Sequence, residues 1–192
     1  SIDGLNVFYG RKQVVHDVSF DLAKAEVVAL VGESGSGKEL VARLIHEQGP
    51  RSENQDALLI EGFAQTGLVA VADGMGGHVG GDVASASAVI DLTHLDRGGF
   101  GGHAVTELAD EIQNANLILN ELVHANPKLA GMGTTVTALL RAGSKLALAH
   151  IGDSRVYRYR GGELTQITTD HTFVQHLVNT GKITPEEAET FL

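Results

Sequence analysis

One long stretch with helical periodicity lies between two groups of strand-like segments, and this arrangement constrains the fold most strongly. The stretch runs from about residue 103 to residue 125, and its apolar residues recur three and four positions apart: Val105, Leu108, Ile112, Ala115, Leu119 and Leu122. This spacing predicts an amphipathic helix with one buried face.

Short turns between the strand-like segments predict antiparallel pairing. Residues 57–63 and 67–74 are expected to pair around a turn at Gln65-Thr66. After residue 134 come the strand-like segments "TTVTALLRAG", "KLALAHIG", "SRVYRYRGG" and "ELTQIT". Turns at Ala142-Gly143-Ser144 and Gly161-Gly162 predict that they form an antiparallel meander. Further helices are predicted over residues 82–95 and 173–179, and a capping box at residues 184–187 predicts the start of a last helix.

Composition excludes several classes of function. The net charge of -10 argues against a general nucleic-acid binder, because such proteins present a basic surface. The absence of cysteine rules out disulfides and thiolate zinc sites. No apolar run is long enough to span a membrane, and the first residues lack the basic and apolar pattern of a signal peptide. These features predict a cytoplasmic location.

The segment "GESGSGKELVARLIH" has the glycine and lysine spacing of a P-loop, with Gly32, Gly35, Gly37 and Lys38 as candidate phosphate-binding residues. Glu39 follows the lysine, where a Ser or Thr would hold magnesium. Residues 2–38 resemble the start of an ABC-transporter ATPase subunit, and residues 32–47 resemble AAA+ transcriptional activators. No later motif of either family follows. We interpret residues 1–48 as an incomplete P-loop NTPase-like segment, with ATP binding as an alternative function.

Three aspartates at strand ends or in loops, Asp56, Asp73 and Asp153, are candidate metal ligands. If they point into a common cleft, their carboxylates and water suit Mg²⁺ or Mn²⁺, and two such ions can neutralise a phosphoryl group. Arg51 precedes Asp56 and can grip phosphate oxygens through its planar guanidinium. For any one of these aspartates alone, a role in a turn or a cap is the alternative.

Four motifs occur in order: R-x-x-N-Q-D at residues 51–56, D-G-M-G-G-H at 73–78, G-M-G-T-T at 131–135 and G-D-S-R at 152–155. With them, residues 49–192 resemble the bacterial PPM family, the type 2C metal-dependent protein Ser/Thr phosphatases. The resemblance implies an α+β fold, namely an α-β-β-α sandwich of two antiparallel sheets. It also implies that a metal-activated water at a two-metal Mn²⁺ or Mg²⁺ site hydrolyses phosphoserine and phosphothreonine. Substrates would be phosphoproteins, as targets of a bacterial Ser/Thr kinase.

The resemblance also implies roles for individual residues. Arg51 would bind phosphate, and His78 would act as a general acid, with a surface or indirect role as its alternative. The metal ligands would be Asp56 for one ion, Asp73 bridging both, the Gly74 carbonyl, and Asp153 for a third, weaker ion. Gln55 occupies the place of a residue that often acts through water.

The chain also departs from the family pattern. Two further metal-binding aspartates of the family are expected beyond Leu192, and the P-loop-like segment stands where the family has its first strand. We therefore expect a C-terminally truncated domain over residues 49–192, an incomplete sandwich, and unpaired strand edges that favour self-association. Asp170 is the first candidate for a substitute ligand. A catalytically silent remnant that only binds partners is the remaining alternative.

Overall fold

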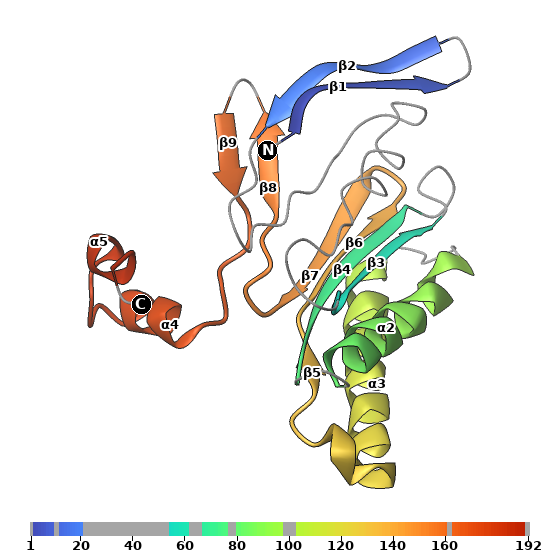
Figure 1. Cartoon of the computed structure of the whole chain (residues 1–192), viewed down its shortest axis with the longest axis vertical. Helices are drawn as coiled ribbons and strands as arrows, with labels where there is room; N and C mark the ends of the chain where they lie inside the picture. The colour runs from blue at the N-terminus through green and yellow to red at the C-terminus, as the bar shows by residue number, and fades with distance from the viewer. Residues whose placement is uncertain are drawn as a thin grey trace.

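The computed structural model describes residues 2–9, 12–20, 54–61, 67–76, 80–97, 103–160 and 163–190. At its centre lies a five-stranded antiparallel sheet with the order β3-β4-β6-β7, in which the short β5 also pairs with β4 (Figure 1). Its strands are β3 (Asp56–Glu61), β4 (Leu68–Met75), β5 (Gly133–Thr134), β6 (Val136–Ala142) and β7 (Lys145–Ile151). The predicted pairing of the first two segments is confirmed, and their predicted turn at Gln65-Thr66 lies outside the described residues.

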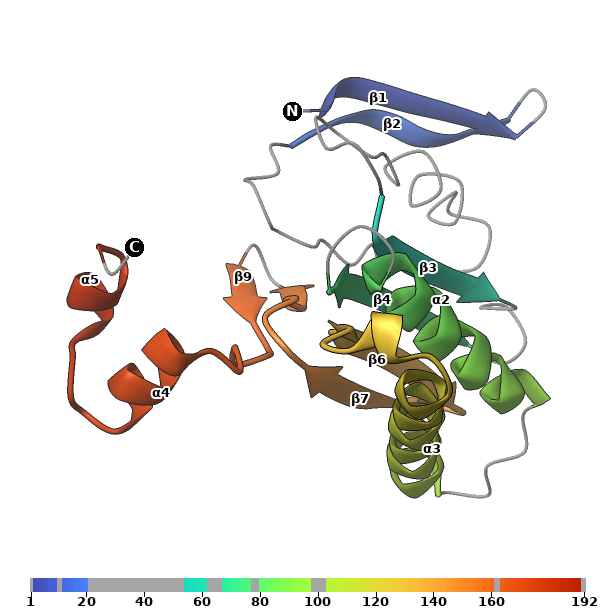
Figure 2. The same ribbon diagram turned by 60° about the horizontal axis from the view of Figure 1, so that its bottom comes forward.

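Two helices, α2 (Gly81–Leu92) and α3 (Ala104–Ala125), cover one face of this sheet (Figure 2). Alternate residues of β4 are buried, as expected for a strand whose successive side chains point to opposite faces. The buried set of β4 joins apolar side chains of both helices in one core: Leu68, Ala70, Ala72, Ala88, Val89, Leu92 and Leu108. The helix predicted over residues 82–95 is confirmed as α2, although its last turn continues as a 3-10 helix, η1 (Thr93–Arg97).

Helix α3 confirms the predicted long helix, but its buried stripe begins one residue earlier than predicted. Ala104, Leu108 and Ala115 are buried, whereas the side chain of Val105 is 68% exposed. Spacing of three and four residues fits Val105 and Ala104 almost equally well, so the periodicity alone did not fix the start. The short Ala104 side chain faces the core and lets the first turn of α3 approach it closely.

The predicted four-strand meander is correct for its two hairpins and wrong in joining them into one sheet. Strands β8 (Tyr157–Arg160) and β9 (Glu163–Gln166) pair with each other and form a separate two-stranded sheet in the described part of the chain. The break follows β7, where Gly152 has a left-handed φ of 105° and turns the chain out of the sheet. The turns predicted from the sequence lie within the two hairpins, and none of them indicated that pairing stops after β7.

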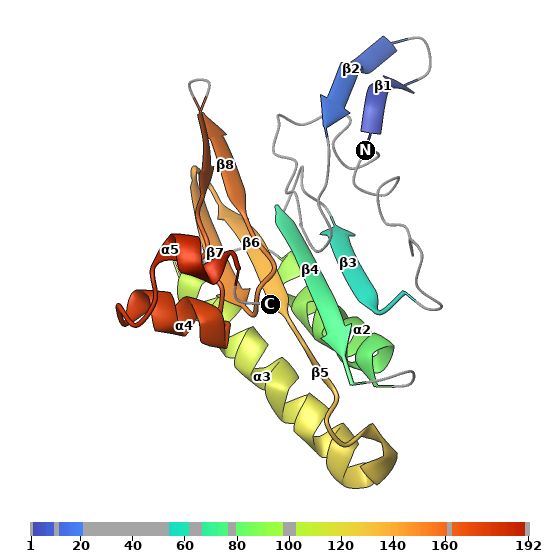
Figure 3. The ribbon, with the colours of Figure 1, turned by 60° about the vertical axis from the view of Figure 1, so that its left-hand side comes forward.

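Helices α4 (Phe173–Asn179) and α5 (Pro185–Ala188) confirm the two predicted C-terminal helices. The Thr184 and Glu187 side chains form the predicted capping box at the start of α5. Both helices lie on the side of the sheet away from α2 and α3 (Figure 3). Near the other end of the chain, β1 (Ile2–Tyr9) and β2 (Lys12–Phe20) form an antiparallel hairpin. Among the described helices, none has the length and apolar character needed to cross a bilayer.

Candidate functional site

The candidate site is built around two aspartates that face each other across neighbouring strands. In the antiparallel register of β3 and β4, Asp56 lies directly opposite Asp73. Opposed residues of such a pair project to the same face of a sheet. Asp73 alternates with the buried residues of β4 and is itself half-buried, while Asp56 is exposed. The two carboxylates therefore share the sheet face that α2 and α3 leave uncovered.

The backbone around these aspartates is held by hydrogen bonds that converge on Gln55. The Gly74 N–H donates to the Gln55 carbonyl oxygen at 3.0 Å, and the Ser85 hydroxyl of α2 donates to the same oxygen at 2.6 Å. The two neighbours of Gln55 in the chain are also joined, because the Asp56 N–H donates to the Asn54 side-chain oxygen at 3.1 Å. These contacts fix the start of β3 against the end of β4 and the first turns of α2.

Gly74 occupies a position that no larger residue can fill without displacing its surroundings. A Cβ atom at Gly74 would lie 2.8 Å from the Gln55 carbonyl oxygen and would overlap the Gly81 carbonyl. A Cβ at Gly81 would in turn lie 2.8 Å from the Gln55 side-chain oxygen. Gly74 at the end of β4 and Gly81 at the start of α2 are therefore explained by close backbone approach.

Two threonines of the G-M-G-T-T motif clamp the backbone of Asp73. The Thr135 hydroxyl accepts from the Asp73 N–H at 2.9 Å, and the Thr135 N–H donates to the Asp73 carbonyl oxygen at 2.8 Å. The Thr134 hydroxyl donates to that carbonyl oxygen at 3.0 Å. Sequence reasoning gave neither threonine a role, although the motif that contains them was the available signal.

Asp153 is exposed, and the turn that carries it is linked to Asp73 through side-chain hydroxyls. The buried Ser154 hydroxyl lies 3.0 Å from the Thr135 hydroxyl, which also bonds the Asp73 N–H. Within the described residues, however, no group of three carboxylate or histidine side chains is close enough to hold a metal ion. In this part of the chain, Asp56, Asp73 and Asp153 therefore do not form one cluster of metal-binding side chains.

Of the remaining predicted site residues, the structure describes only Asp170. Arg51 and His78 lie outside the described residues, as do all four P-loop residues, Gly32, Gly35, Gly37 and Lys38. Asp170, the candidate substitute ligand, accepts hydrogen bonds from Arg155 through both carboxylate oxygens, the shortest at 2.7 Å. This geometry makes Asp170 the counter-ion of an arginine.

The donor atoms that the structure does bring together fit a hard divalent cation. Asp56 and Asp73 offer carboxylate oxygens on one face, next to the tightly packed backbone of Gly74. Mg²⁺ and Mn²⁺ prefer such oxygen ligands, and Mg²⁺ usually keeps several waters beside one or two carboxylates. A pair of aspartates with an adjacent carbonyl therefore suits these ions even without a third carboxylate.

Comparison with known families gives two matches along the chain. Residues 46–192 match the family described as Protein phosphatase 2C, and residues 15–68 match the family described as ABC transporter. The chain is 49% identical over 140 residues to the serine/threonine protein phosphatase PstP of Mycobacterium tuberculosis, covering 73% of this chain and 26% of PstP. It is 37% identical over 150 residues to the protein phosphatase PhpP of Streptococcus pneumoniae, covering 72% of this chain and 58% of PhpP. The chain thus spans only part of both relatives.

Solved structures give the same result for the fold. A crystal structure of Mycobacterium tuberculosis PstP superposes with a TM-score of 0.68 at 48% identity, covering 73% of this chain and 58% of that one. The PstP catalytic domain in complex with two manganese ions gives a TM-score of 0.65 at 49% identity, covering 72% and 58%. The predicted fold class, an α+β architecture with antiparallel sheets of the phosphatase type, is confirmed.

Proposed function

The chain belongs to the protein phosphatase 2C family, and on this basis we propose that it hydrolyses phosphoserine and phosphothreonine in proteins. The observation that carries the proposal is the register of β3 and β4, which sets Asp56 opposite Asp73 beside the backbone of Gly74. Carboxylate oxygens on the sheet face away from α2 and α3 are suited to divalent cations, which in turn would neutralise a phosphorylated side chain. In our proposal, residues 49–192 form the phosphatase domain and residues 1–48 precede it.

We propose Mn²⁺ or Mg²⁺ as the cofactor, held by the Asp56 and Asp73 carboxylates and the Gly74 carbonyl. Two such ions supply Lewis acidity that activates a water molecule and neutralises charge on the phosphoryl group. The chain contributes a fixed geometry, because the Asp73 backbone forms three hydrogen bonds with Thr134 and Thr135. Asp153 is proposed as a ligand of a third, weaker ion.

The other assignments extend this proposal. Arg51 would hold the phosphate through paired hydrogen bonds from its guanidinium, and His78 would protonate the departing seryl or threonyl oxygen. Gln55 would act through a water molecule. The substrates would be phosphoproteins modified by a bacterial Ser/Thr kinase, in the cytoplasm.

The test combines hydrolysis of an aryl phosphate and of a phosphothreonine peptide with Mn²⁺ binding measured by calorimetry. Asp73→Asn should abolish Mn²⁺-stimulated hydrolysis and metal binding, and Asp56→Asn should weaken both. Asp110→Asn, the same change at an exposed position of α3, is the matched control and should leave both unchanged. Mn²⁺-stimulated hydrolysis that survives Asp73→Asn intact would exclude the proposed centre.

A second candidate function is ATP binding, favoured by the ABC transporter match over residues 15–68. Its ligands would be Gly32, Gly35, Gly37 and Lys38. This function predicts that Mg·ATP raises the melting temperature of the wild-type chain and that Lys38→Ala removes the rise. Lys38→Ala should leave Mn²⁺-stimulated hydrolysis unchanged if the phosphatase proposal is right. A catalytically silent, partner-binding chain would show neither the hydrolysis nor the thermal shift.

A further inference from the structure

The turn that carries Asp153 runs beside a segment that precedes α4. Residues 152–156 and 167–171 lie antiparallel and are joined at both ends by backbone hydrogen bonds. The His171 N–H donates to the Gly152 carbonyl oxygen at 2.8 Å, and the Ile167 N–H donates to the Val156 carbonyl oxygen at 2.7 Å. We call residues 167–171 the flanking segment. It has no regular secondary structure, so side-chain contacts must complete its attachment.

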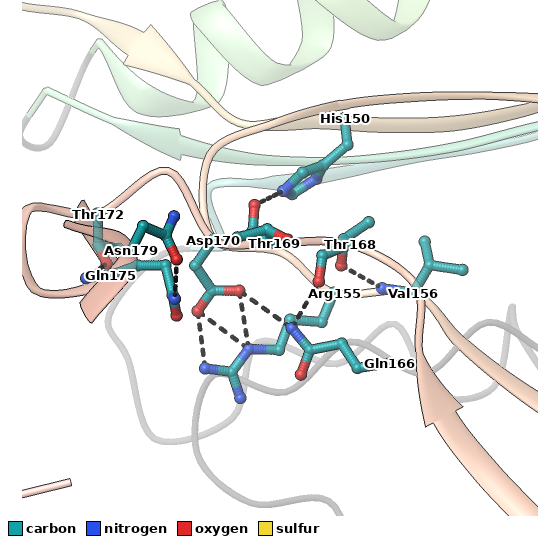
Figure 4. A network of polar contacts seen from close by, with 10 residues as sticks. All are labelled: His150, Arg155, Val156, Gln166, Thr168, Thr169, Asp170, Thr172, Gln175 and Asn179. Atoms are coloured by element: carbon teal, nitrogen blue, oxygen red, sulfur yellow. Dashed lines mark hydrogen bonds and ion pairs between the residues drawn. The ribbon is translucent and has the colours of Figure 1, made fainter. Parts of the chain in front are cut away.

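An ion pair in the middle of this arrangement joins the turn to the flanking segment (Figure 4). The Arg155 guanidinium donates to both carboxylate oxygens of Asp170, with distances of 2.7, 3.0 and 3.1 Å. The Asp170 side chain is only 10% exposed, and the Arg155 side chain is 38% exposed. Bidentate pairs of this kind are stronger and more directional than ordinary hydrogen bonds, and the burial of Asp170 reduces screening by solvent.

Neighbouring side chains hold the flanking segment in the same place. The Val156 N–H donates to the Thr168 hydroxyl at 3.0 Å, and the Gln166 amide donates to the Thr168 carbonyl oxygen at 2.9 Å. From the central sheet, His150 Nε2 lies 3.2 Å from the Thr169 carbonyl oxygen, and His150 Nδ1 lies 3.0 Å from the Thr137 hydroxyl. A neutral imidazole that carries its proton on Nε2 satisfies both contacts.

The opposite side of the Asp153 turn is attached, through Thr135, to the backbone of Asp73. The Ser154 hydroxyl contacts the Thr135 hydroxyl, which accepts from the Asp73 N–H. A Cβ at Gly152 would lie 2.7 Å from the Thr135 Cβ, so the turn is also packed against Thr135. Asp153 itself is exposed. Its position is therefore set by its neighbours, since the contacts on either side of it hold the backbone.

From this geometry we infer that Arg155 and Asp170 are positioning residues, whose ion pair holds the Asp153 turn in register with Asp73. The inference rests on the proposed function in one respect, namely that Asp153 binds a metal ion. Breaking the pair should release one side of the turn while the Ser154 and Thr135 contact remains. Asp153 would then sample several positions, and a cation would bind there more weakly. Loss of such an orienting partner typically costs about tenfold or more in metal affinity.

The test uses Arg155→Gln and Asp170→Asn in the full chain, with Arg158→Gln as a matched control. Arg158 is an exposed arginine of β8, two residues beyond Val156. Hydrogen exchange should show faster exchange of the amides of residues 152–156 in Arg155→Gln than in Arg158→Gln. Paramagnetic broadening by Mn²⁺ should require about tenfold more metal at Asp153 but the same amount at Asp73. The exchanged pair Arg155→Asp with Asp170→Arg should restore both readouts in part.

Two outcomes would overturn the inference. The first is unchanged exchange of residues 152–156 and unchanged broadening at Asp153 in both single variants. The second is a lower melting temperature with the metal dependence at Asp153 unaltered, since a merely structural pair would behave in this way. Neither readout requires turnover. If the wild-type chain hydrolyses no phosphate ester, the proposed function fails while exchange and broadening still decide the role of the ion pair.

Discussion

Replacing Thr135 with valine tests whether its hydroxyl connects the two aspartate motifs. Valine keeps the branched shape of the side chain and removes only the oxygen. That oxygen accepts from the Asp73 N–H at 2.9 Å and contacts the Ser154 hydroxyl at 3.0 Å. Thr135 and Ser154 are both buried, so water can replace neither contact easily. Each polar group left without a partner costs about 1–3 kcal/mol, and Thr135→Val, which leaves two such groups, should therefore destabilise the fold by about 2–6 kcal/mol.

Two further variants separate the hydroxyl from the packing around it. Thr135→Ser keeps the oxygen and removes one methyl group, which should cost only about 1 kcal/mol. Ser154→Ala removes the other hydroxyl of the pair, and its combination with Thr135→Val should cost less than the sum of the single changes. Urea titration measures the free energy of unfolding of all four proteins, namely the two Thr135 variants, Ser154→Ala and the double variant. Equal losses for Thr135→Val and Thr135→Ser, or strictly additive losses in the double variant, would refute the reasoning.

Three other predictions follow from burial and close packing. Leu108→Ala should cost about 2–5 kcal/mol of unfolding free energy, whereas Val105→Ala should cost less than about 0.5 kcal/mol; equal losses in urea titration would contradict the register of α3. Gly74→Ala should lower both the melting temperature and Mn²⁺ affinity, because its Cβ would overlap the Gly81 carbonyl; wild-type values by calorimetry would contradict the packing. Burial raises the pKa of Asp91 in the folded protein above its ordinary value of 3.8. The folded state therefore loses stability as the pH rises above that value and Asp91 becomes ionised. Asp91→Asn should therefore raise the melting temperature at pH 7 and leave it unchanged near pH 3, and an equal shift at both would refute this assignment.

The elements that the sequence predicted well are those whose signals are local. Helix α3 has a long apolar period, and α5 has a complete capping box at Thr184 and Glu187, so each could be placed without knowledge of the rest of the chain. The start of the buried stripe in α3 could not, because Ala104 and Val105 differ by one position and only contact with the core distinguishes them. Likewise, the end of sheet pairing after β7 depends on the left-handed Gly152 and its packing against Thr135, which are not local signals.

The candidate site shows the same division between local and long-range information. Asp56 and Asp73 could be named from their motifs, and their opposition follows from the register of two strands that the turn signals had already paired. The connection to Asp153 could not be predicted in this way, because it runs through Thr135 and Ser154. A hydroxyl carries no strong sequence signal, since threonine and serine occur in turns, caps and strands alike. The motifs G-M-G-T-T and G-D-S-R therefore share one physical task, which is to hold the backbone of one aspartate motif against the next.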